Sequence, residues 1–229
     1  MGVNRNHNLE VGKGKRNPKA VIFDLWDTLV EWPVDEAETL KRRLAADAAV
    51  DEEEFERRWL SGYRASQTGP LAASYRALGV PETLVAGHVA ARHAFARSAL
   101  RLRERARETI GALRARGYAI GLISVCSEEV PAAWPESELA GLFDVETFSS
   151  DCGLMKPDPE IYLRTADRLR VAAADSVFVG DGANDELGGA ARVGMTPVLF
   201  VPDGTPRCPA LAGWDGLRID TLPELLEIV

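Results

Sequence analysis

The chain is poor in the residues that build disulfide frameworks and histidine metal sites. Its 229 residues include three cysteines and three histidines. No two cysteines form a CxxC pair, and their odd number favours reduced thiols, so we expect a cytoplasmic protein without a disulfide framework. His88 and His93 are five residues apart in one helical segment, a spacing that does not stack them on one helix face. A histidine metal pair is therefore not expected.

Long apolar runs and an excess of positive charge are also missing. No apolar stretch approaches the roughly 18 residues that cross a membrane, so we expect no membrane partner. The 27 basic residues are outnumbered by 35 acidic ones, which gives a formal net charge of −8. This charge repels polyanions and argues against a nucleic-acid partner. It also repels a small phosphate ester, so a site for such a substrate would need a metal ion or a local cation.

The N-terminal segment, residues 1–18, differs from the rest because it is basic and rich in glycine and asparagine. It lacks the apolar stretch of a secretion signal. We predict that it is a flexible leader.

Strands that alternate with helices predict an α/β core with a doubly wound parallel sheet. The first strand pattern, AVIFDL, is apolar and β-branched, as in strands buried on both faces. The expected strands are Ala20–Leu25, Tyr118–Ser124, Val145–Ser150, Ser176–Gly180, Thr196–Val201 and Leu217–Ile219. The helical segments that follow are Glu104–Arg116, Glu128–Trp134, Pro159–Leu169, Asp185–Val193 and Leu222–Ile228.

Between the first two strands, residues 32–102 show no strand pattern. Their spacing predicts about four helices, with acidic residues or proline at the helix starts. The expected helices are Asp35–Ala48, Asp51–Ala65, Pro70–Leu78 and Pro81–Leu100. We therefore predict an all-helical cap domain over 32–102, inserted into a core domain that comprises 19–31 and 103–229.

Polar side chains stand where buried strands end, which is where open parallel sheets bind their ligands. Asp24 ends the first strand, and a carboxylate can act as a covalent nucleophile. Ser124 ends the second, and its hydroxyl with the next backbone N–H can hold phosphate oxygens; Ser127 is the alternative. Lys156 precedes a proline and so lies in an extended loop, where it offers a point charge to a carboxylate or a phosphate.

The fourth strand is followed by a cluster of acids in VFVGDGANDE. Asp181 comes directly after the strand, and Asp185 and Glu186 are within one loop of it. Carboxylate oxygens are the ligands that Mg²⁺ prefers. Asp185 could instead cap the helix that follows. The sequence thus predicts a magnesium site that includes Asp181.

In this order the four motifs resemble those of the haloacid dehalogenase superfamily, whose members are mostly phosphatases. They are FDLWDTL, GLIS, MKPDP and VGDGANDE, and the resemblance covers Lys19 to Val229. It implies a Rossmann-like core with a helical cap of the family's first type. It also implies a Mg²⁺-dependent hydrolase that acts on a small phosphate monoester through an aspartyl-phosphate on Asp24.

The resemblance also assigns roles to the residues of the motifs. Mg²⁺ would bind Asp24, the backbone carbonyl of Trp26, Asp181 and a second acid of the fourth motif. The spacing GDGAND makes that second acid Asp185, whereas the register of the following ELGGAARVGM makes it Glu186. We keep both alternatives at this point.

The transferring phosphoryl group would be bound by the hydroxyl of Ser124, the backbone N–H of Val125 and the ammonium of Lys156. Family members often make a side-chain contact from the position after the serine. Valine at 125 cannot make that contact, although its backbone N–H remains.

The most informative departure from the family is Trp26. Family phosphatases usually carry an aspartate two residues after the nucleophile, which protonates the leaving oxygen and then activates water. General acid–base help of this kind is worth about 10²–10⁴ in rate. Asp27 comes one residue later and points elsewhere, and Glu31 and Asp35 are the other acids nearby.

Two other functions fit parts of the pattern. The 2-haloacid dehalogenases of this superfamily also carry an aromatic residue in place of the second aspartate, because a halide leaves without a proton. They use no metal and lack the first aspartate of the fourth motif, whereas this chain has Asp181. A catalytically weakened binding or regulatory module is the remaining alternative, but it would not need to keep Asp24, Lys156 and Asp181.

Overall fold

A parallel six-stranded sheet forms the centre of the molecule, with the strand order β3-β2-β1-β4-β5-β6. The computed structural model describes residues 18–204, 206, 208 and 211–229, so all but the last residue of the predicted leader lies outside the described residues. The strands are β1 (Ala20–Phe23), β2 (Ala119–Ser124), β3 (Val145–Phe148), β4 (Ser176–Gly180), β5 (Thr196–Phe200) and β6 (Leu217–Ile219).

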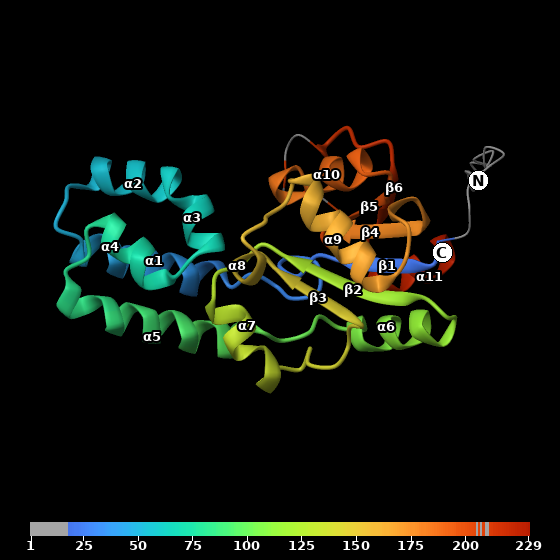
Figure 1. Ribbon diagram of the computed structural model, residues 1–229, viewed down its shortest axis with the longest axis horizontal. Coiled ribbons are helices and arrows are strands. Elements are labelled where there is room, and N and C mark those ends of the chain that lie inside the picture. Colours follow the sequence, from blue (N-terminus) through green and yellow to red (C-terminus); the bar gives the residue numbers. More distant parts are fainter. Residues whose placement is uncertain (1–17, 205, 207, 209–210) are drawn as a thin grey trace, which may run out of the picture.

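Helices cover both faces of the sheet, which confirms the predicted doubly wound α/β core (Figure 1). The side chains of β1 alternate between the faces. Val21 and Phe23 pack with Ile110 of α6, whereas Ile22 packs with Tyr162 of α9. The core helices are α6 (Ala106–Ala115), α7 (Glu129–Ala133), α8 (Ser149–Cys152), α9 (Pro159–Leu169), α10 (Glu186–Arg192) and α11 (Leu225–Ile228), with short 3-10 turns at Trp134–Glu136, Ala173–Asp175, Ala183–Asp185 and Leu222–Glu224.

Strand β1 lies between β2 and β4. Phe23 is level with Leu122 of β2 and with Val179 of β4. This register places the residues after these three strands side by side at one edge of the sheet. Asp24 and Asp181, which follow β1 and β4, are brought to this edge by the topology and not by their spacing in the sequence.

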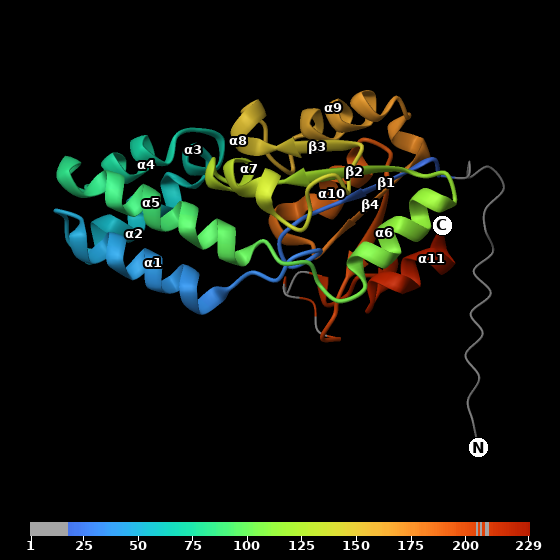
Figure 2. The ribbon, with the colours of Figure 1, turned by 90° about the horizontal axis from the view of Figure 1, so that it is seen from below.

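Five helices occupy the interval between β1 and β2 and lie together beyond the carboxyl edge of the sheet (Figures 1 and 2). They are α1 (Val34–Asp47), α2 (Glu52–Ser61), α3 (Tyr63–Thr68), α4 (Leu71–Leu78) and α5 (Glu82–Ala99). Their buried side chains form a cluster of their own, separate from the two clusters that line the sheet. We refer to these helices as the cap.

The cap has one helix more than the sequence pattern predicts, because the expected helix Asp51–Ala65 is broken at Gly62. The amide of Gly62 closes α2 by donating to the Arg58 carbonyl at 2.8 Å. A Cβ at this position would lie 2.8 Å from the same carbonyl oxygen, so this close approach favours glycine. The chain then starts α3 at Tyr63.

The third expected strand, Val145–Ser150, is also shorter in the structure. It ends at Phe148, and Ser149 begins the helical turn α8. The Ser149 hydroxyl is bonded to backbone atoms of Cys126 and of Gln67, at 2.9 and 2.7 Å. These bonds tie the chain to the loop after β2 and to the cap instead of continuing the strand ladder.

Two segments that lie side by side connect the cap to the core. Val30 and Leu102 form an antiparallel bridge, and the amide of Arg103 donates to the Leu29 carbonyl at 2.8 Å. In the part of the chain that the structure describes, no helix is long and apolar enough to cross a membrane.

Candidate active site

Asp24 begins the loop after β1 and is 5% exposed. Its backbone amide donates to the Val179 carbonyl of β4 at 2.9 Å, which continues the ladder by one residue. The carboxylate is therefore held at the centre of the carboxyl edge by a backbone that has little freedom. This is the position in which an open parallel sheet binds its ligand.

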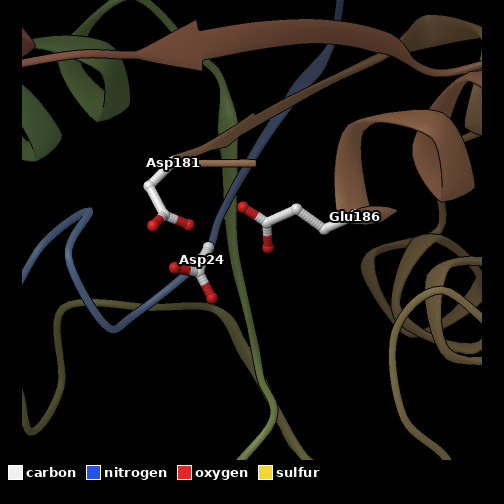
Figure 3. A group of neighbouring side chains, drawn as sticks. All are labelled: Asp24, Asp181 and Glu186. Carbon is white, nitrogen blue, oxygen red and sulfur yellow. The ribbon is translucent and has the colours of Figure 1, made fainter. Parts of the chain in front are cut away.

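Three carboxylates from different segments converge at this point (Figure 3). Asp24 follows β1, Asp181 follows β4, and Glu186 is the first residue of α10. One oxygen from each lies within 4.8 Å of the others, and all three residues are buried. Buried like charges this close repel strongly unless a cation lies between them.

Lys156 supplies one such cation. It is 2% exposed, and its Nζ donates to Asp24 Oδ1 and to Glu186 Oε2, the latter at 2.5 Å. Burial alone would lower the pKa of Lys156, but the charges of Asp24 and Glu186 outweigh burial and raise it. The side chain therefore stays an ammonium at neutral pH and links Asp24 to Glu186 of α10.

One lysine does not balance three carboxylates. Burial, followed by the charge of Asp24, raises the pKa of Asp181, and the same two causes hold the pKa of Glu186 well above its usual range. With all three acids ionised the cluster has two negative charges in excess. A divalent cation would cancel this excess.

The structure brings Glu186, and not Asp185, into the cluster. Asn184 and Asp185 both adopt left-handed backbone conformations, with φ of 54° and 53°. Asn184 lines the cavity above Asp24, whereas Asp185 does not. The Asp185 side chain is 62% exposed and pairs with Arg192 at 2.9 Å. Asp185 does not act as an N-cap residue either, because its side chain makes no hydrogen bond to the backbone at the start of α10.

Glycine at position 180 makes room for Glu186. A Cβ there would lie 2.1 Å from Glu186 Oε1. The same oxygen accepts the backbone N–H of Gly182 at 2.9 Å. The two glycines of the GDG motif therefore cradle the glutamate, a function that the motif spacing did not reveal.

Ser124 ends β2 as expected, and it is fully buried. Its Oγ has no hydrogen-bond partner among the described residues, and Ser124 itself does not line the cavity above Asp24. Val125 follows it and lines the cavity above Asp24. Ser127, the alternative, is engaged elsewhere, because its hydroxyl donates to Glu129 at 3.0 Å.

Among the described residues of the core, no acid takes the place of the aspartate that Trp26 replaces. Asp27 adopts φ 58°, and its Oδ1 accepts the Trp32 amide at 3.0 Å and lies 3.9 Å from Arg103. Its carboxylate thus closes the turn after β1. Glu31 and Asp35 are exposed, and neither lines the cavity above Asp24.

A cavity of about 400 Å³ extends from Asp24 into the cap. Trp26 lines it and packs edge-to-face against Trp32, with ring centroids 4.8 Å apart. Trp59 and Tyr75 line it as well, and both also pack in the apolar cluster of the cap. The sequence pattern favours core packing for these aromatic residues, and the structure shows that they pack in the core and face the cavity.

Several polar contacts join the cap to the core around this cavity. Arg92 of α5 donates to the fully buried Glu129 at 2.8 Å. The Leu71 amide, at the start of α4, donates to Glu128 at 3.1 Å. Sequence reasoning missed the Arg92–Glu129 pair because 37 residues separate the partners, and only the cap's position over the sheet brings them together.

The comparisons with known proteins agree with this geometry. A family model described as haloacid dehalogenase-like hydrolase matches residues 18–194. The glyceraldehyde 3-phosphate phosphatase of Methanopyrus kandleri is 30% identical over 92% of this chain and 97% of its own length. The (S)-2-haloacid dehalogenase 4A of Burkholderia cepacia is 35% identical over 102 residues, which is 44% of each chain, so this match spans less than half of that enzyme.

Solved structures agree on the fold. The crystal structure of a HAD phosphatase from Thermococcus onnurineus superposes with a TM-score of 0.69 at 24% identity, over 92% of this chain and 97% of that one. At this identity the likeness concerns the fold alone.

Proposed function

Because the chain belongs to the haloacid dehalogenase-like hydrolase family, we propose that it is a Mg²⁺-dependent phosphatase that hydrolyses a small phosphate monoester through Asp24. The observation that carries the proposal is the buried group of Asp24, Asp181 and Glu186, tied together by Lys156. The similarity to a phosphatase over nearly the whole chain supports it.

The donor set fits Mg²⁺. Hard divalent cations take oxygen ligands, and the three carboxylates supply oxygens and the missing counter-charge. Both oxygens of Glu186 already accept bonds from Lys156 and Gly182, which leaves Asp24 and Asp181 as the more open donors. The backbone carbonyl of Trp26 would complete the set, as the family resemblance implies. When bound, the ion would stabilise the negative charge that develops on the transferring phosphoryl group.

The chain's own residues supply the nucleophile and the phosphate-binding groups. A carboxylate oxygen of Asp24 attacks phosphorus, forms an aspartyl-phosphate, and displaces the alcohol oxygen with the bonding electrons. Lys156 orients Asp24 and balances its charge. The unpartnered hydroxyl of Ser124 and the amide of Val125 bind phosphoryl oxygens. Water then cleaves the aspartyl-phosphate, which releases phosphate and restores the carboxylate.

One observation favours a second candidate, a 2-haloacid dehalogenase. Trp26 leaves the first motif without the acid that protonates an alcohol, and a halide needs no proton. The partial match to a haloacid dehalogenase points the same way. Against it, a metal-free reaction leaves Asp181, next to Asp24, with a backbone hydrogen bond from Ala183 but no ion pair among the described residues.

A metal-dependence assay separates the two functions. We expect phosphate release from small monoesters that stops when a chelator is added and returns with Mg²⁺, together with a rise in Tm on Mg²⁺ addition. Asp181→Asn should abolish both effects, whereas the matched variant Asp185→Asn should preserve them because Asp185 lies outside the cluster. Chelator-resistant halide release from a 2-chloroacid, without phosphate release, would establish the dehalogenase instead.

A further inference from the structure

We infer that the substrate is an aryl phosphate, the phosphate ester of a phenol, whose leaving oxygen departs without a proton from the enzyme. This inference rests on the proposed phosphatase function and names its substrate class. Three features carry it: the absence of an acid at position 26, the walls of the cavity, and the pairing of the cations in those walls.

The first feature is the missing proton donor. Trp26 places an indole where the leaving oxygen would meet an acid, and Asp27 is held by the Trp32 amide. The other acids that line this cavity are the three of the cluster and Glu38, an exposed residue of the cap helix α1. Within the described residues, no carboxylic acid other than the cluster and Asp27 lies in the core wall of the cavity.

The chemistry of the leaving group can compensate for this gap. A phenol has a pKa of about 10, as tyrosine does, whereas an aliphatic alcohol is close to water, at about 15.7. When the bond from Asp24 to phosphorus forms, the bond from phosphorus to the aryl oxygen breaks and its electrons remain on that oxygen. The phenolate is stable enough to leave and later takes its proton from water. An alkoxide would need an acid at position 26.

The second feature is the aromatic wall of the cavity. Five aromatic residues line it: Trp26, Trp32, Trp59, Tyr63 and Tyr75. The Trp26 and Trp32 rings form an edge-to-face pair that continues to Phe95, with centroids 5.4 Å apart. Such walls bind a further ring with favourable stacking geometry. The volume of about 400 Å³ lies within the range of small-molecule sites, about 300–1,000 Å³.

The third feature is that the cations in the cap wall already have partners. Lys41 pairs with Glu56 at 2.9 Å, and Arg92 with Glu129 at 2.8 Å. Arg58 pairs with Glu54 at 2.6 Å. Among the described residues, these are the basic side chains that the cap contributes to the cavity. The cap wall thus offers the leaving group an apolar surface and ion pairs whose charges are already balanced. It has no unpaired cation, among the described residues, for a second negatively charged group on the substrate.

A substrate series separates leaving-group chemistry from size. Phenyl phosphate and benzyl phosphate carry the same ring, but only the first has a phenolic leaving oxygen. We expect kcat/KM to be about 10²-fold or more higher for phenyl phosphate, the scale of the absent acid's contribution. Cyclohexyl phosphate and glyceraldehyde 3-phosphate should both be poor substrates. Equal kcat/KM values for the phenyl and benzyl esters would overturn the inference.

Trp26→Asp tests the cause of this preference. A restored acid should raise kcat/KM for benzyl phosphate by about tenfold or more and should change kcat/KM for phenyl phosphate little. The ratio of the phenyl value to the benzyl value should therefore fall. Glu38→Gln and Tyr63→Phe check for a donor in the cap. If either variant lowered kcat/KM for benzyl phosphate tenfold while leaving phenyl phosphate unchanged, the cap would supply the proton and the inference would be wrong.

Cavity filling tests where the ring binds. Ser74 of α4 lines the cavity, whereas its exposed neighbour Ala73 does not. Ser74→Phe should raise KM for 1-naphthyl phosphate about tenfold, and the matched Ala73→Phe should leave it unchanged. Equal KM values in both variants would place the ring elsewhere. Failure of every ester, with and without Mg²⁺, would refute the phosphatase function itself, whereas efficient hydrolysis of aliphatic esters would refute only this inference.

Discussion

The cavity above Asp24 has a floor, formed by Asp24, Asp181, Glu186 and Lys156 of the core, and a roof, formed by the cap helices. The two differ in how their charges are compensated. In the floor, Lys156 and the three acids are buried and close together, and the pKa values of Lys156, Asp181 and Glu186 are raised. In the roof, the three basic residues that the cap contributes to the cavity are each paired with an acid, and aromatic rings line the cavity beside them. The floor concentrates charge for one chemical step, whereas the roof neutralises charge and offers shape. Under the proposed function, the reaction would depend on the core and the choice of substrate on the cap.

The largest expected effect comes from removing the nucleophile in the floor. Asp24→Asn keeps the shape of the side chain but cannot form the aspartyl-phosphate, so we expect kcat to fall by about 10⁴-fold or more. Steady-state phosphate release measures this loss. The matched control is Asp185→Asn, which removes an exposed carboxylate one loop away. Substantial turnover by Asp24→Asn would show that another group attacks the substrate.

The next largest effect concerns stability. Lys156→Met removes the ammonium that compensates Asp24 and Glu186, and uncompensated buried charge costs about 3–5 kcal/mol. Urea unfolding measures the free energy of unfolding. The control in the roof is Lys41→Met, which breaks a partly exposed pair with Glu56 worth at most about 1 kcal/mol. Similar losses in both variants would contradict the contrast between floor and roof.

The smallest effect concerns an exposed ion pair of the cap. Hydrogen bonds from Arg57 and then Arg58 lower the pKa of Glu54 from 4.5 to about 2. A lowered pKa in the folded state stabilises the fold above pH 4.5, and this contribution disappears as the pH falls to about 2. Glu54→Gln should therefore be less stable than the unchanged protein above pH 4.5, and this difference in stability should shrink as the pH falls to about 2. Thermal unfolding at a series of pH values measures the difference. Glu53→Gln, on the same helical turn, should show no such pH-dependent difference. Identical pH profiles for both variants would contradict the assignment.

The elements of the core were predictable because their patterns are local. Apolar, β-branched runs bounded by glycine and polar residues marked each strand, and the six strands and their parallel arrangement are confirmed. The errors arose where a contact distant in sequence overrode the pattern. Ser149 leaves the third strand because it bonds to the backbone of Gln67 in the cap. The break between α2 and α3, by contrast, has a local cause, which is Gly62 itself. The sequence pattern predicts one continuous helix there because the helical spacing of apolar residues continues across Gly62.

The site was predictable in composition but not in arrangement. Asp24 and Asp181 directly follow β1 and β4, and the sheet topology brings these strand ends together, whereas Lys156 reaches the site from the loop between α8 and α9. The choice between Asp185 and Glu186 depends on the left-handed backbone of Asn184 and Asp185 and on the space beside Gly180. The local sequence pattern does not predict either feature. The engagement of Asp27 with Trp32 likewise depends on the fold of the turn after β1.

By itself the sequence determined the α/β core, the inserted helices and the family, because these follow from periodicity and from motifs that are short in sequence. Tertiary structure alone decided which acid completes the cluster, which cations are already paired, and which residues line the cavity above Asp24. Those features depend on side chains from the cap and the core that meet only when the cap lies over the carboxyl edge of the sheet. Pairwise distances set electrostatic and packing energies, and a linear chain does not specify distances between residues that are far apart in it.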